Sequence, residues 1–206
     1  FTFPLQRPEE MVETVLRRRD ELGLPLARTF PAFRKVVTER VIRSIAKENA
    51  LFSLVTALPD VIPTVLELPW AVGEFATDTA FLTMNQMRMA FLLAGASDRP
   101  IGFAQQKVEV AGIVAGAFGW RAIARELVGK IPLGGGLIPK TAIAYAGTYT
   151  VGRSLERLYR MGYGYTREER KMVYAEAYDR GKRVAGSLVE RIKSGNDPSS
   201  EHVEED

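Results

Sequence analysis

The stretch from Phe103 to Met161 is rich in glycine and alanine, and it constrains the fold more than any other part of the sequence. Two apolar runs flank a glycine- and proline-rich turn, Ile131–Pro139. A glycine inside a helix costs about 1 kcal/mol relative to alanine, and glycines are retained where two helix backbones approach closely. The pattern therefore predicts a tight antiparallel helical hairpin. The expected packing positions are Gly112, Gly116 and Gly119 on the first arm, and Ala144, Gly147 and Gly152 on the second.

The composition excludes several kinds of catalytic and metal site. The chain has 206 residues, of which 46% are hydrophobic and 26% charged, and this is typical of a globular domain. It contains no cysteine, which excludes disulfides, thiolate metal sites and cysteine nucleophiles. His202 is the only histidine, so a histidine triad or a clustered-histidine metal site cannot form. We expect no enzymatic activity, no cofactor and no bound metal.

Charge is distributed unevenly along the chain. The formal net charge is +3, but residues 195–206 contain five acidic residues and no basic one, which leaves +8 on the rest. We predict one helical domain over residues 1–194 and a disordered acidic tail over residues 195–206. A basic body suggests an anionic partner, either lipid headgroups or nucleic acid.

The remaining periodicity predicts an all-α protein, a helical bundle built around the hairpin. Gly23-Leu24-Pro25 is expected to end the first helix, and Thr166 with Glu169 has the spacing of a capping box at the start of the last one. Besides the hairpin, the expected helices cover residues 8–22, 31–58, 70–96 and 166–193.

A conventional membrane span is not expected. A spanning helix needs about 20 mostly apolar residues, and the longest uncharged runs are shorter, at Asn49–Pro59, Val110–Trp120 and Thr141–Gly152. The hairpin could instead be the buried core of a soluble domain or a shallow membrane insertion, and the sequence does not separate these two interpretations.

The helix over residues 31–58 has an apolar stripe and a basic side. Phe33, Val37, Val41 and Ile45 recur every four residues. The basic side is either an ordinary solvated face or a contact for an anionic membrane surface. Nucleic acid is an unlikely partner because no recognition motif is present. The candidate membrane or anion contacts are Arg34, Lys35, Arg40, Arg43 and Lys47.

A second stripe, of methionine and phenylalanine, lies in the helix expected over residues 70–96. Such a stripe forms either core or a groove for a partner helix, an apolar ligand or a second copy of the chain. Its members are Phe81, Met84, Met87 and Phe91.

Two weaker patterns have simpler structural interpretations. Gly134–Thr141 is similar to a phosphate-binding P-loop, but Pro139 replaces the second glycine and removes a backbone donor, which favours a structural turn. Four carboxylates lie seven, seven and four residues apart. This spacing favours a solvated helix face over a metal site or an acid–base catalytic site. The four are Asp60, Glu67, Glu74 and Asp78.

Several short motifs follow one another in an order that resembles a known bacterial family. They are Leu58-Pro59-Asp60-Val61-Ile62-Pro63, Asn85-Gln86-Met87-Arg88-Met89, Lys130-Ile131-Pro132-Leu133-Gly134 and Ala146-Gly147-Thr148-Tyr149-Thr150-Val151-Gly152-Arg153. The succession, over about residues 55–162, resembles the bacterial domain of unknown function DUF697 and, more loosely, the EcsC-like proteins. The resemblance implies membrane association and an accompanying GTPase, which would lie upstream of Phe1 or on a separate chain. It implies no catalytic residues.

Together these observations lead to two functional hypotheses. The first is a non-enzymatic helical scaffold or interaction protein in the bacterial cytoplasm, peripheral to or partly inserted in the inner membrane, for which the resemblance suggests a role accessory to a GTPase. The second is a soluble helical module that binds an apolar ligand or lipid, or self-assembles through its apolar hairpin.

Overall fold

The computed structural model describes residues 8–57, 78–113 and 136–194, and these residues form helices and no strand. The predicted all-α class is confirmed. The elements are α1 (Pro8–Arg18), the 3₁₀-helix η1 (Asp20–Leu22), α2 (Gly23–Thr29), α3 (Pro31–Val55), α5 (Asp78–Ala96), α7 (Leu137–Met161) and α8 (Arg167–Lys193). Residues 107–113 are also helical. The second arm of the predicted hairpin is α7, whereas most of the first arm lies outside the described residues.

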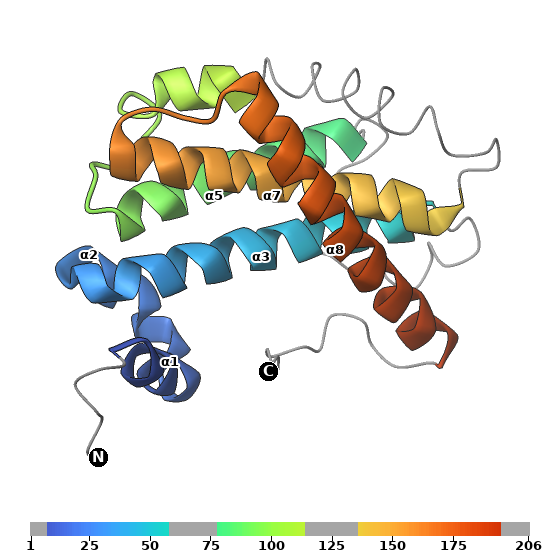
Figure 1. Ribbon diagram of the computed structural model, residues 1–206, viewed down its shortest axis with the longest axis horizontal. Helices are drawn as coiled ribbons and strands as arrows, with labels where there is room; N and C mark the ends of the chain where they lie inside the picture. Colours follow the sequence, from blue (N-terminus) through green and yellow to red (C-terminus); the bar gives the residue numbers. More distant parts are fainter. Residues whose placement is uncertain (1–7, 58–77, 114–135, 195–206) are drawn as a thin grey trace.

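Three long helices, α3, α5 and α7, lie side by side, and α8 crosses over α7 and α3 (Figure 1). The predicted stripe on α3 turns inward: Phe33, Val37 and Ile45 are buried and Val41 is half-buried. Burying each such side chain contributes about 1.5–3 kcal/mol. The main core between α3, α5, α7 and α8 includes Ile42, Leu54, Met89, Leu93, Tyr145 and Tyr174.

The N-terminal part of the chain differs from the predicted single helix over residues 8–22. α1 ends at Arg18, and η1 turns the chain into α2. Gly23 caps the end of η1 but does not stop the helical path, because its φ of −54° and ψ of −56° also make it the first residue of α2. Pro25 lies in the first turn of α2, where a missing N–H costs nothing. A second, smaller core forms here from Val12, Leu16, Ala27, Phe33, Val37 and Ala96.

The connection between α7 and α8 follows the sequence prediction closely. Gly162 ends α7 in the left-handed conformation, with φ of 86°. The Thr166 hydroxyl accepts a hydrogen bond from the Glu169 N–H at 3.2 Å, and the Glu169 carboxylate accepts one from the Thr166 N–H at 2.8 Å. This is the predicted capping box. The Arg157 guanidinium lies between the rings of Tyr163 and Tyr165, at 5.2 and 4.8 Å, and bonds Glu169 at 2.7 Å.

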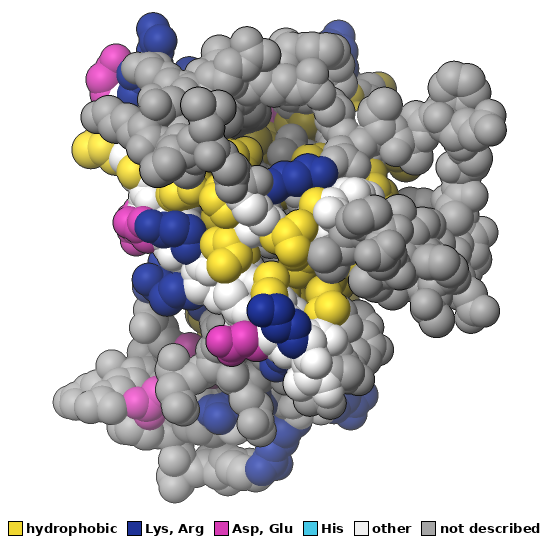
Figure 2. Space-filling model, turned by 90° about the vertical axis from the view of Figure 1, so that its right-hand side faces the viewer, with side chains coloured by type: hydrophobic (Ala, Val, Ile, Leu, Met, Phe, Trp, Pro, Cys, Tyr) yellow, Lys and Arg dark blue, Asp and Glu magenta, His cyan; other side chains and the backbone are white. Residues whose placement is uncertain are grey.

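One end of the bundle combines apolar and charged side chains. Figure 2 shows hydrophobic side chains gathered on the face at the right of Figure 1, with Lys and Arg side chains beside them. α5 and α7 begin at this end and α3 ends there (Figure 1). Ile138, in the first turn of α7, is 40% exposed.

Candidate functional site

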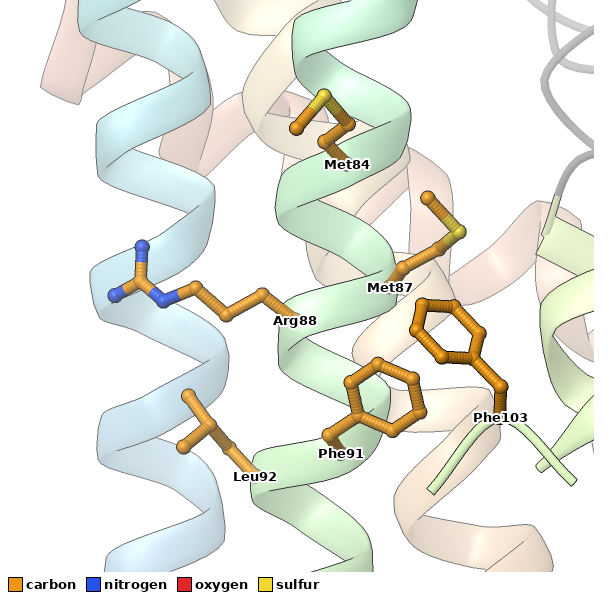
Figure 3. A pocket seen from close by; sticks show the side chains of 6 residues that line it. All are labelled: Met84, Met87, Arg88, Phe91, Leu92 and Phe103. Carbon is orange, nitrogen blue, oxygen red and sulfur yellow. The ribbon is translucent and has the colours of Figure 1, made fainter. Parts of the chain in front are cut away.

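A shallow groove runs along α5, and most of the predicted methionine and phenylalanine stripe lines it. Its volume is about 280 Å³, and Met84, Met87, Phe91 and Phe103 supply its apolar lining. The rings of Phe91 and Phe103 meet edge to face at 5.0 Å (Figure 3). Phe81 instead stacks on Phe52 of α3 at 3.8 Å. A groove of this size accommodates an apolar side chain or a short acyl segment.

Arg88 and Leu92 complete the lining of the groove. Arg88 reaches from α5 toward α3 (Figure 3) and donates to the Glu48 carboxylate at 2.8 and 3.3 Å. Its side chain is 54% exposed, so this ion pair is screened by water and contributes little to stability. The groove is therefore apolar, with a charged pair at its edge.

Among the candidate membrane contacts on α3, Arg34, Arg40 and Arg43 bond to named groups within the protein. Arg34 donates to the carbonyl oxygens of Ala27 and Arg28 at 3.1 and 3.3 Å. Since these carbonyls lie in the last turn of α2, Arg34 caps that helix. Lys35 is exposed and Lys47 is half-buried.

The other two arginines also contribute to the fold. Arg40 bonds the Asp20 carboxylate at 3.2 Å, and Arg43 bonds Glu39 at 2.7 Å. Sequence periodicity places these side chains on the basic side of α3 but says nothing of their acceptors. The basic side of α3 thus contacts α2 through Arg34 and η1 through Arg40, while Arg43 pairs within α3.

Glu39 is the centre of an ionic layer between α3, α7 and α8 that the sequence analysis missed. Besides Arg43, its carboxylate accepts hydrogen bonds from the Tyr149 hydroxyl at 3.0 Å and from Arg153 at 3.1 Å. Arg180 of α8 lies over the Tyr149 ring, 5.1 Å from its centre. Burial raises the pKa of Tyr149, and the charge of Glu39 raises it further. No sequence signal links Glu39 to residues more than a hundred positions away.

A buried amide cluster joins α3, α5 and α7. Asn49 donates to the Thr148 hydroxyl at 2.7 Å, and Asn85 donates to the Asn49 carbonyl oxygen at 2.8 Å. Gln86 also approaches Thr148, at 3.4 Å. All four side chains are at most 7% exposed. Because each polar group here needs a partner, the cluster fixes how the three helices align. In the sequence, this cluster is indicated only by two amide residues, Asn85 and Gln86, within an otherwise apolar helix.

Among the glycines and alanine predicted to pack between the hairpin arms, Gly152 lies against two other helices. A Cβ at Gly152 would lie 2.8 Å from Ile42 and 2.9 Å from Met89, so α7 approaches α3 and α5 closely there. No described residue lies within 4 Å of a Cβ built at Gly112 or Gly147, and because most of the first arm lies outside the described residues, the predicted packing of these two glycines between the arms stays a prediction. Ala144 is buried, and Gly116 and Gly119 lie outside the described residues.

A second close helix contact occurs at a glycine that the sequence analysis did not select. A Cβ at Gly181 of α8 would lie 2.9 Å from the carbonyl oxygen of Ala142 and 3.1 Å from its Cα atom. These are backbone atoms of α7, so α8 can pass at this point only because residue 181 has no side chain. At this crossing the backbones of α7 and α8 themselves come into contact distance.

The segment resembling a P-loop is the start of a helix in the structure. Gly136 precedes α7, Pro139 lies in its first turn, and Thr141 is fully buried. A Thr hydroxyl in the interior cannot reach a nucleotide-bound metal ion at the surface. Of the spaced carboxylates, Asp60, Glu67 and Glu74 lie outside the described residues. Among the described residues, no cluster of His, Cys, Asp or Glu could hold a metal ion.

Comparisons with known proteins gave no match: none of the family models fits the chain, and no similar curated protein or solved structure was found. The resemblance to DUF697 therefore stays a prediction.

None of the described helices is both long enough and apolar enough to span a bilayer.

Proposed function

We propose that this protein is a non-enzymatic helical interaction protein that associates with an anionic membrane surface. The observation that carries the proposal is that large hydrophobic side chains stay on the outside of a bundle whose interior is well packed. Phe103 is 66% exposed, Val108 73% and Met84 57%. Exposed apolar residues that lie together are characteristic of surfaces that bind proteins or membranes.

Charge supports the same function. Without its acidic C-terminal residues 195–206 the chain carries a formal charge of +8, and anionic lipid attracts a basic residue near the surface with about 1 kcal/mol. The internal bonds of Arg34, Arg40 and Arg43 move the proposed contact away from the basic side of α3.

Vesicle flotation of the whole chain tests this function. We expect the protein to float with vesicles of phosphatidylcholine and phosphatidylglycerol, and to float less with phosphatidylcholine alone or at high salt, because screening weakens surface electrostatics. Protein that stays at the bottom of the gradient with both kinds of vesicle would rule the function out.

The groove on α5 supports a second candidate function, the binding of an apolar ligand. Its lining by Met84, Met87, Phe91 and Phe103 suits an acyl chain or an apolar side chain. Protein purified without detergent would then carry an extractable apolar molecule, detected by mass spectrometry after organic extraction. Replacing Phe91 with Ser should abolish that occupancy, whereas Met172→Ser, at an exposed position on α8, should not.

A further inference from the structure

Three helices end on the same side of the bundle, at the left of Figure 1: α2 at Thr29, α5 at Ala96 and α7 at Met161. The turn after α5 ties these ends together. The Asp98 carboxylate lies 3.4 Å from Nε of Arg28, at the end of α2. Arg99 donates to the carbonyl oxygen of Tyr159, near the end of α7, at 2.8 Å. The turn thus contacts the ends of both other helices, through a solvent-exposed ion pair to α2 and a hydrogen bond to α7.

The loop that follows this turn displays apolar side chains on a rigid frame. Gln106 is 3% exposed, and its side chain accepts from the Gly102 N–H at 2.8 Å and donates to the Pro100 carbonyl oxygen at 2.7 Å. Between these anchors Ile101 is 53% exposed and Phe103 is 66% exposed. A loop already ordered by internal hydrogen bonds loses less entropy when its side chains enter another phase.

The neighbouring helix ends add further exposed apolar groups. Phe30 is 52% exposed, Met161 52% and Tyr163 54%. The exposed side chains of Phe30, Ile101, Phe103, Met161 and Tyr163 lie at or after the ends of α2, α5 and α7, and we call them together the apolar end. Aromatic side chains with a polar tip, such as Tyr163, suit the boundary between lipid and water.

The charges around the apolar end have a positive excess. The cations are Arg28, Arg34, Arg99, Arg157 and Arg160, and the anions are Asp98, Glu109 and Glu169. Arg28 and Arg160 are exposed beside the apolar side chains. Apolar side chains surrounded by more cations than anions complement an anionic bilayer, in which negatively charged headgroups lie above a hydrocarbon interior.

We propose that the apolar end is the membrane-contacting surface, so that the bundle docks end-on, with Ile101, Phe103 and Met161 entering the headgroup region of an anionic bilayer. Arg28 and Arg160 then lie at the level of the lipid phosphates. This inference rests on the proposed function and names the lipid-facing site and the orientation of the helices.

Single-cysteine labelling tests the orientation, because the natural chain contains no cysteine. Ile101→Cys, Met161→Cys and Ile138→Cys are each labelled with a polarity-sensitive fluorophore. Ile138 is the matched control: it lies at the other end of α7, about 35 Å from Met161. On addition of phosphatidylglycerol-containing vesicles, we expect a blue shift of the emission at positions 101 and 161 and no shift at 138.

The outcomes separate the two proposals. If the unlabelled natural chain does not float with vesicles, the proposed function and this inference both fail. If it floats but the label at 138 shifts as much as those at 101 and 161, or position 101 does not shift, only the end-on orientation fails. A shift at 101 that follows protein concentration without vesicles would identify a second copy of the chain as the occupant, and it would overturn the lipid assignment.

A variant measures the contribution of the loop. Ile101→Ser with Phe103→Ser should weaken vesicle binding at least about tenfold, since two large apolar groups no longer leave water. Met172→Ser, with an equally exposed side chain on α8, should bind like the natural chain. Equal binding by the loop variant, with its helical circular dichroism retained, would overturn the inference.

Discussion

The crossing of α7 and α8 at Gly181 gives the sharpest test of the packing. A methyl group there would meet the Ala142 carbonyl oxygen at 2.9 Å, its Cα atom at 3.1 Å and Cβ of Tyr145 at 3.2 Å. Gly181→Ala gains about 1 kcal/mol of helix propensity, but overpacking a close contact costs about 1–3 kcal/mol. The two nearest atoms are backbone and cannot rotate away. We therefore expect a net loss of up to about 2 kcal/mol in the free energy of unfolding.

The matched control is Gly186→Ala, one and a half turns further along α8. No described residue lies within 4 Å of a Cβ at Gly186, so this variant should keep the propensity gain and be stabilised by up to about 1 kcal/mol. Urea titration followed by far-UV circular dichroism measures both changes. The reasoning is refuted if the two variants shift stability in the same direction by the same amount.

Three further predictions concern the polar groups that the structure places inside the bundle. Asn49→Ala leaves the Asn85 amide without its acceptor and should lower the unfolding free energy by about 1–3 kcal/mol; an unchanged urea midpoint would contradict this. Glu39→Gln removes the carboxylate that Arg43 and Arg153 share, and thermal melting should show a loss of similar size, about 1–3 kcal/mol. A hydrogen bond from the Thr166 N–H and the bond from Arg157 lower the pKa of Glu169. The contribution of Glu169 to the free energy of unfolding is therefore present above its unfolded pKa of about 4.3 and is lost as the pH falls through the lower folded value. The stability difference between the natural chain and Glu169→Gln should therefore shrink in acid, and a constant difference down to pH ~2 would exclude the assigned role.

Local signals in the sequence were enough to predict the all-α class and the starts of α3 and α8. The capping box at Thr166 depends only on residues three apart, and Gly162 ends α7 through its own backbone conformation. The stripe on α3 was also visible, because burial follows the helical period. The prediction at Gly23 was incomplete because Gly23-Leu24-Pro25 resembles the end of a helix, whereas a proline two residues after the glycine also suits the first turn of a new helix, here α2.

The parts of the site that sequence reasoning missed depend on contacts between distant residues. Glu39 and Arg153 are separated by 114 positions, and Asn49 and Thr148 by 99. Their pairing is a consequence of helix packing and has no local pattern. The same applies to the apolar end, which forms only when the turn at Asp98 and Arg99 brings the ends of three helices together.

The most direct test compares two sets of arginines in one vesicle-binding titration. Arg28 and Arg160 lie at the apolar end, whereas Arg40 and Arg43 lie on the basic side of α3 and bond Asp20 and Glu39. At about 1 kcal/mol for each cation near an anionic surface, Arg28→Gln with Arg160→Gln should weaken binding by about tenfold or more. Arg40→Gln with Arg43→Gln, assayed below its melting temperature, should bind nearly as well as the natural chain. Loss of binding in the α3 variant and not in the other would contradict the account.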